Sequence, residues 1–126
     1  MAEAATLVAG DTAPCISAQR PIDLVHLARM TFGDRTLERE VLGLFERQAC
    51  LLIGRMKELG TAAVPGLAHT LKGSARGIGA WQVASAAEML ESAAADGEAA
   101  VHSALTVLET ATEEARGAIA DLLRNA

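Results

Sequence analysis

Apolar residues recur every three or four positions through most of the chain, and breaks near glycines divide this pattern into segments. The spacing places them on one face of an α-helix, which turns once in 3.6 residues. The predicted helices cover residues 22–32, 35–59, 61–78, 81–95 and 98–123, the third beginning between Thr61 and Pro65. Short connections force consecutive helices to run antiparallel. The sequence therefore predicts an all-α, antiparallel up-down-up-down four-helix bundle with an additional short N-terminal helix.

The composition agrees with packed helices. Of the 126 residues, 51% are apolar but only 2% are aromatic, so the core is built from Ala, Leu, Val and Ile. Ala and Leu lose little on entering a helix. Residues 1–20 contain Gly10, Asp11 and Pro14 and show no sustained period. We predict a flexible or loosely docked leader over residues 1–20 and one domain over residues 21–126.

Charge and cysteine content argue against several classes of protein. The formal net charge is −5 and no run of Lys and Arg occurs, which disfavours nucleic acid as a partner. No apolar run approaches the roughly 20 residues of a membrane-spanning helix, so no membrane partner is expected. Cys15 and Cys50 cannot form a disulfide framework, and no signal segment opens the chain. A reduced, cytoplasmic setting follows, with Cys50 as a buried, inert thiol.

The third predicted helix contains the residues with the clearest chemistry. Its apolar face is formed by Leu67, Leu71, Ala75 and Ile78. Its opposite, solvent-facing side carries His69, Lys72, Gly73 and Arg76. Lys72 lies one turn after His69, where its ammonium reaches a group attached to the imidazole. Gly73 costs the helix about 1 kcal/mol relative to Ala, and its bare surface leaves room for a partner to approach.

A neutral imidazole is a nucleophile near neutral pH, and the bond it forms with phosphorus is labile enough to pass the group on. Around this histidine the chain follows a recognisable order: His, an apolar residue, Lys-Gly, small residues, and a further Gly near the helix end. The matching positions are His69, Leu71, Lys72, Gly73, Ser74, Ala75 and Gly79. The segment resembles the histidine-containing phosphotransfer (HPt) family of multistep phosphorelays. Ile22-Asp23, residues 41–45 and Leu90-Glu91 look like that family's framing segments, so the resemblance covers about residues 20–124.

The resemblance implies a phosphoryl carrier without autokinase activity. His69 would accept the group from a receiver-domain aspartate and pass it to another. Lys72 would stabilise it, Gly73 would give access, and Ser74 and Arg76 are secondary binding candidates. The implied partners are receiver domains of response regulators and of a hybrid histidine kinase.

The receiver would supply Mg²⁺, so the carrier, expected to be a monomer, needs no cofactor or metal of its own. Some family members have a Gln near the histidine on the following helix, and Glu91 takes that place here. Because a carboxylate repels a phosphoryl group, we leave Glu91 outside the predicted site.

Three alternative functions are weighed against the carrier. A histidine-kinase dimerisation domain would have an acidic residue after the histidine, where this chain has Thr70. A metal-binding bundle lacks support, because neither the histidines nor the cysteines have ligand spacing. A non-phosphorylated helical adaptor that binds receiver domains remains open.

Other residues are given structural interpretations. His26 and His102 are predicted to be solvated, Trp81 to anchor the core or a helix start, and Gly77 to serve packing or helix ending. The predicted core stripe of the second helix is Leu37, Val41, Leu44, Phe45, Gln48, Leu52, Met56 and Leu59. Leu42, Ala49 and Ile53 lie off that stripe. They are expected to pack against the first helix or the leader, with a docking patch beside His69 as the alternative.

Overall fold

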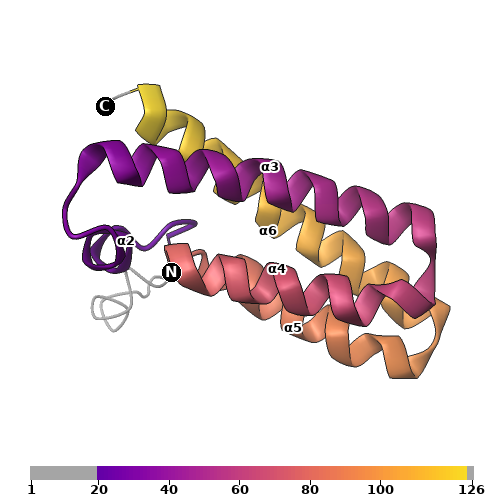
Figure 1. The fold of residues 1–126 in the computed structure, drawn as a ribbon. Helices are drawn as coiled ribbons and strands as arrows, with labels where there is room; N and C mark the ends of the chain where they lie inside the picture. Colours follow the sequence, from indigo (N-terminus) through magenta and orange to yellow (C-terminus); the bar gives the residue numbers. More distant parts are fainter. Residues whose placement is uncertain (1–19, 125–126) are drawn as a thin grey trace, which may run out of the picture.

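The computed structural model describes residues 20–124, and the structural statements below concern that part of the chain. Its elements are α2 (Leu24–Met30), α3 (Arg35–Leu59), a 3-10 turn η2 (Thr61–Ala63), α4 (Val64–Ile78), α5 (Trp81–Ala93), a 3-10 turn η3 (Ala94–Asp96) and α6 (Glu98–Arg124). The four long helices alternate in direction, and α6 closes the bundle against α3 (Figure 1). The short α2 lies at one end of this bundle. The predicted all-α bundle with an extra N-terminal helix is confirmed.

Most helix ends follow the predicted breaks. Asp23 and Asp34 cap α2 and α3, and a proline lies in the first turn of α4, where its missing N–H does no harm. The helix predicted to run to residue 95 ends at Ala93 and tightens into η3. All of the predicted leader except the exposed Arg20 lies outside the described residues. No helix between residues 20 and 124 is long and apolar enough to span a membrane.

The core stripe of α3 differs from the predicted one. Leu44 and Leu59, expected to face the core, are 58% and 61% exposed. The buried residues of this helix are Leu42, Phe45, Ala49, Leu52, Ile53 and Met56. Two overlapping apolar stripes run along α3 and share Phe45, Leu52 and Met56. The bundle buries the stripe that also contains Leu42, Ala49 and Ile53, where α3 packs against α4 and α6. Leu42, Ala49 and Ile53 therefore belong to the core stripe, and the alternative prediction that they form an exposed docking patch is wrong.

Asp23 fastens α2 to the turn between α4 and α5. Its N–H donates to the carbonyl of Gly79 at 2.9 Å, and its Oδ2 accepts a hydrogen bond from Trp81 Nε1 at 2.8 Å. Gly79 has φ +82°, and a Cβ there would lie 2.9 Å from the Asp23 carbonyl oxygen. Only glycine fits this position, because both the conformation and the space exclude a side chain. Trp81, the first residue of α5, is the helix-start anchor that was predicted.

Two predictions about burial are wrong. His26 is half-buried rather than solvated: its ring packs edge-on against Trp81, with centroids 4.8 Å apart. Its Nε2 is buried and has no hydrogen-bond partner in the described part of the chain. Cys50 is exposed rather than buried, because the core stripe passes through Ala49 and Ile53 and leaves the thiol at the edge of α3. His102 is exposed, as predicted.

Candidate functional site

His69 lies on the outer face of α4. Its side chain is 67% exposed, whereas Leu71, Ala75 and Ile78 on the opposite face are buried in the core. The 3.6-residue period of the sequence predicts this division. An imidazole in this position is open to a macromolecular partner while its helix is held firmly by the bundle.

Glu91 on α5 joins His69 to Lys72. Its Oε2 lies 3.2 Å from His69 Nδ1, and its Oε1 accepts a hydrogen bond from Lys72 Nζ at 3.0 Å. The Lys72 side chain is only 13% exposed, so its ammonium is held between the helices. Two residues one turn apart on α4 therefore share a single carboxylate on the neighbouring antiparallel helix.

This contact defines the tautomer of a neutral His69. An ionised carboxylate only accepts hydrogen bonds, so a neutral imidazole that pairs with it carries its proton on Nδ1. The lone pair is then on Nε2. Glu91 thus fixes both the tautomer and the orientation of the ring, as carboxylates paired with histidine commonly do in reactive sites.

Lys72 also stabilises the charged form of Glu91. The hydrogen bond from Lys72 is the largest cause that lowers the pKa of Glu91, and the contact with His69 lowers it further. Glu91 is therefore ionised at neutral pH, and the ammonium balances its charge. The carboxylate that orients the imidazole does not leave a net negative charge beside it.

A model of the Hpt domain family matches residues 40–125, which is most of the chain. The chain belongs to the Hpt domain family. Membership implies a phosphotransfer role in two-component signalling, carried out by a phosphocarrier that interacts with response-regulator receiver domains. Neither the comparison with curated proteins nor that with solved structures gives a match.

Glycines leave the outer face of α4 in this Hpt domain bare. A Cβ built at Gly73 or at Gly77 would meet no atom within 4 Å. Close helix packing therefore does not explain Gly77, and the helix ends at Gly79 instead, so the structural role predicted for Gly77 was wrong. Gly73, one turn after His69, leaves open space on this face, and its role in partner access stays a prediction.

Ser74 and Arg76 contact side chains other than His69. The Ser74 hydroxyl donates to Gln48 Oε1 on α3 at 2.6 Å, which ties α4 to α3. Arg76 lies 3.9 Å from Glu88 on α5, and both side chains are more than half exposed. Such a surface pair contributes about 0–1 kcal/mol. Neither residue has a recorded contact with His69, so the structure groups His69 with Lys72 and Glu91 rather than with Ser74 or Arg76.

The residue missing from the predicted site is Glu91. The prediction that excludes Glu91 treats its carboxylate alone, without the ammonium of Lys72 that pairs with it. The signal available in the sequence was Lys72, which follows His69 by one turn and faces the same helix edge. No group of three or more potential metal ligands occurs among the residues that the structure describes.

Proposed function

We propose that His69 is the phosphoryl-carrying residue of this Hpt domain. It takes the group from a receiver-domain aspartate and delivers it to another receiver-domain aspartate. The observation that supports this most strongly is an exposed imidazole whose Nδ1 is held by Glu91, beside a glycine with open space around it.

The transfer step follows from the tautomer. His69 Nε2 attacks the phosphorus of the receiver's aspartyl phosphate, an N–P bond forms, and the bond from phosphorus to the aspartate oxygen breaks to release the carboxylate. The ring keeps its Nδ1 proton and gains positive charge, which the Glu91 carboxylate stabilises. Passing the group on reverses each of these changes at a second receiver.

Lys72 has an indirect role in this scheme. By neutralising Glu91 it removes the repulsion that a lone carboxylate would exert on an incoming phosphoryl group. The partner's Mg²⁺ and aspartates supply the rest of the charge stabilisation, since phosphoryl transfer depends mainly on positioning and charge neutralisation. The carrier needs no cofactor of its own for these roles.

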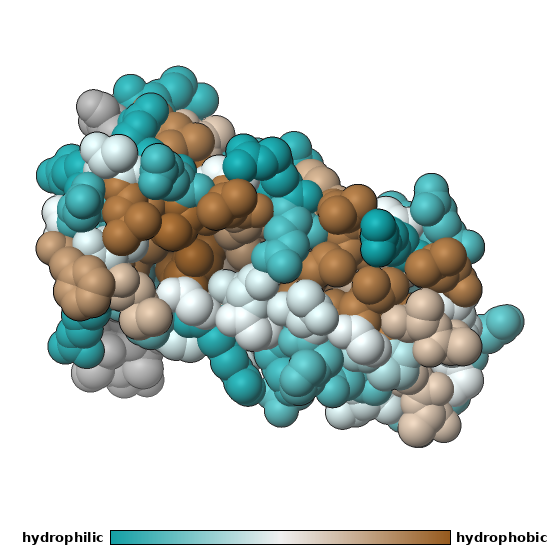
Figure 2. All heavy atoms as spheres, in the orientation of Figure 1, coloured by the Kyte–Doolittle hydropathy of each residue, from teal (hydrophilic) through white to brown (hydrophobic). Residues whose placement is uncertain are grey.

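The face formed by α3 and α4 is the proposed docking surface for the receiver. Figure 2 shows apolar residues gathered along this face of the molecule. On α3, Leu44 and Leu51 are 58% and 55% exposed, although both belong to a helix with a well-formed core stripe. Exposed aliphatic residues beside a bare glycine surface suit a partner that excludes water from the reacting groups.

The test is transfer from a ³²P-labelled receiver to this chain, compared between His69→Gln and the matched control His102→Gln, which alters another exposed histidine. We expect transfer to stop only in the first variant, and the label on the wild-type chain to be acid-labile and base-stable. Circular dichroism checks that both variants fold. Continued transfer to His69→Gln contradicts the proposal. Receiver binding without any transfer supports the adaptor function instead, and self-labelling from ATP alone supports a kinase.

A further inference from the structure

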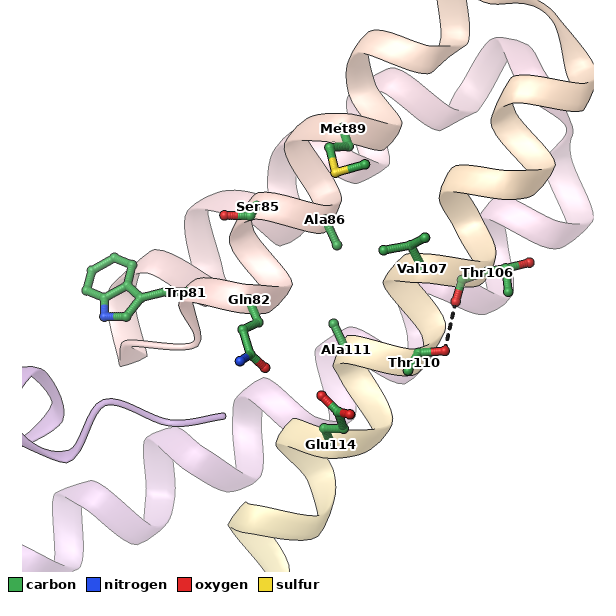
Figure 3. A pocket seen from close by; sticks show the side chains of 10 residues that line it. All are labelled: Trp81, Gln82, Ser85, Ala86, Met89, Thr106, Val107, Thr110, Ala111 and Glu114. Carbon is green, nitrogen blue, oxygen red and sulfur yellow. Dashed lines mark hydrogen bonds between the residues drawn. The ribbon is translucent and has the colours of Figure 1, made fainter. Parts of the chain in front are cut away.

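A second exposed apolar surface lies between α5 and α6. It is a groove of about 710 Å³ whose floor is formed by Ala86 and Met89 of α5 and by Val107 and Ala111 of α6. Figure 3 shows these side chains projecting from the two helices toward the space between them. Met89 is 55% exposed and Val107 is 46% exposed. The groove therefore offers large apolar side chains to a partner rather than burying them.

Two threonines of α6 that line the groove have no free hydroxyl donor. The hydroxyl of Thr106 donates to the carbonyl of His102 at 3.1 Å, and that of Thr110 donates to the carbonyl of Thr106 at 3.2 Å. Both donors are thus used within α6 itself. These threonines therefore offer a partner their methyl groups and hydroxyl acceptors but no free hydroxyl donor.

The charged residues that line the groove and its extensions are all acidic. Two smaller hollows share residues with the groove and extend it along the bundle, and the acidic residues lining them are Glu88, Asp96, Glu109, Glu113 and Glu114. Glu88, Glu109 and Glu113 pair with Arg76, Lys57 and Arg116, so the negative charge left for a partner is mainly that of Asp96 and Glu114. Within the part of the chain that the structure describes, no Lys or Arg lines the groove or these two extensions. Glu114, which borders the main groove, has no ion-pair partner between residues 20 and 124.

We propose that the α5/α6 groove binds an amphipathic, basic α-helix of another protein. A groove between two antiparallel helices accepts a third helix whose apolar face fills it, and lysines or arginines beside that face would meet the acidic edges. The hollows extend from Trp81 to Asp96, about 22 Å at 1.5 Å per residue, which matches a helix of about 15 residues.

Charge argues against the other occupants. Residues 1–19 contain Glu3 and Asp11 but no Lys or Arg, so this segment would not complement the acidic edges. A second copy of the chain brings the same net charge of −5, and two acidic surfaces repel each other.

The groove is separate from the phosphotransfer site. Glu91 faces α4 from one side of α5, whereas Ala86 and Met89 face α6 from the other. Glu88 lies between these two sides, because it pairs with Arg76 on α4 and also lines the hollow that extends to Asp96. A helix bound in the groove would leave His69 accessible. The groove would thus attach this Hpt domain to one partner while receiver domains exchange at His69.

A defined peptide tests the proposal. The probe is a 15-residue helix of Leu and Lys with its leucines on one face, compared with a peptide of the same composition in scrambled order. Trp81 lines the groove and is the only Trp in the chain, so its fluorescence reports binding. We expect the amphipathic peptide to bind, with NMR shift changes confined to α5 and α6, and the scrambled peptide to bind at least about tenfold more weakly.

Matched variants separate groove binding from general attraction between opposite charges. Met89 and Leu51 are both 55% exposed and apolar, but only Met89 lines the groove. Met89→Arg should weaken peptide binding by at least about tenfold, and Leu51→Arg by less than about twofold, because both add the same charge. Glu114→Lys provides a second groove variant should Met89→Arg fail to fold.

Several results would overturn the proposal. These are absence of peptide binding, equal binding of the scrambled peptide, equal weakening by Met89→Arg and Leu51→Arg, or shift changes on α3 and α4. Dimers in sedimentation equilibrium that Met89→Arg abolishes would assign the groove to a second copy instead. Transfer at His69 should be unchanged in Met89→Arg, so this experiment and the test of the carrier function fail independently.

Discussion

Replacing Asp23 by alanine should destabilise the fold more than removal of an ordinary helix cap. Asp23 Oδ1 accepts a hydrogen bond from the N–H of His26 at 3.1 Å, and Asp34 Oδ1 accepts one from Leu37 at the same distance. The two aspartates therefore cap α2 and α3 in the same way. Asp23 differs in one respect, because its second oxygen also accepts the Trp81 indole N–H at 2.8 Å. Asp34→Ala is thus a matched control for the cap alone.

The expected magnitudes follow from these contacts. Loss of an N-cap costs about 1 kcal/mol of unfolding free energy. A hydrogen bond to a charged group adds about 1.5 kcal/mol, the low end of its range because Asp23 is only half-buried. We expect Asp34→Ala to cost about 1 kcal/mol and Asp23→Ala about 2.5 kcal/mol. For a domain of about 100 residues, Asp34→Ala should lower the melting temperature by roughly 5 °C and Asp23→Ala by roughly 10 °C or more.

Asp23→Asn separates the two contributions. Its amide oxygen can still cap α2, but its NH₂ group then faces the indole N–H, so donor meets donor. Asp23→Asn should therefore lower the free energy of unfolding by about 1.5 kcal/mol, the contribution assigned to the Trp81 hydrogen bond alone. Urea and thermal unfolding followed by circular dichroism measure all three variants, and Trp81 fluorescence reports the local change. If Asp23→Ala costs no more than Asp34→Ala, the indole bond contributes nothing and the reasoning fails.

The pH dependence gives an independent check. The hydrogen bond from Trp81 is the main reason that the pKa of Asp23 lies below 3.8 in the folded protein. A carboxylate with a lowered folded pKa stabilises the fold above its unfolded pKa, and this stabilisation is lost as pH falls through the folded value. The stability difference between wild type and Asp23→Asn should therefore be constant at neutral pH and shrink below about pH 4. A difference that grows in acid would contradict this assignment.

Three further substitutions test the site and its support. Lys72→Ala should slow transfer about tenfold, because it leaves the charge of Glu91 unbalanced. Adding Glu91→Gln to the Lys72→Ala chain should restore part of the transfer rate. A double variant as slow as Lys72→Ala alone would exclude the charge of Glu91 as the cause. Gly73→Leu should block transfer and receiver binding without lowering the melting temperature, because leucine favours a helix more than glycine does. Gly54→Leu, at another open glycine within a helix, should leave transfer and receiver binding unchanged. Gly79→Ala should lower the free energy of unfolding by at least about 2 kcal/mol, because of the left-handed φ at this position and the clash of the new Cβ with Asp23. Urea unfolding measures this loss, and a smaller value would mean that α2 moves away freely.

The helices were predictable because their limits are local. Gly60 and Gly79 end helices through positive φ angles that other residues rarely adopt, and Pro65 is compatible only with a first helical turn. The register of α3 was not predictable in the same way. Two apolar stripes on one helix satisfy the same period, and only the packing of the neighbouring helices selects between them. The exposed Leu44 and the buried Leu42 are the result.

Contacts between distant segments lay beyond sequence reasoning for a related reason. Asp23, Gly79 and Trp81 each have an ordinary local explanation as a cap, a helix end and a helix start. Their hydrogen bonds to one another become visible only when α2 is placed against the turn between α4 and α5. His26 illustrates the same point, because nothing in its own neighbourhood indicates that its ring lies against Trp81.

Glu91 shows why charged residues have to be assessed as a group. Considered alone, a carboxylate beside His69 opposes a phosphoryl group, and exclusion of Glu91 followed from that argument. Lys72 lies within 3.0 Å of the same carboxylate and balances its charge, while the carboxylate's other oxygen holds His69 Nδ1. The lysine that the motif assigns to the phosphoryl group therefore acts first on Glu91. In the proposed mechanism the reactivity of His69 depends on the neutral pair that Lys72 and Glu91 form across two helices, and neither partner has that effect by itself.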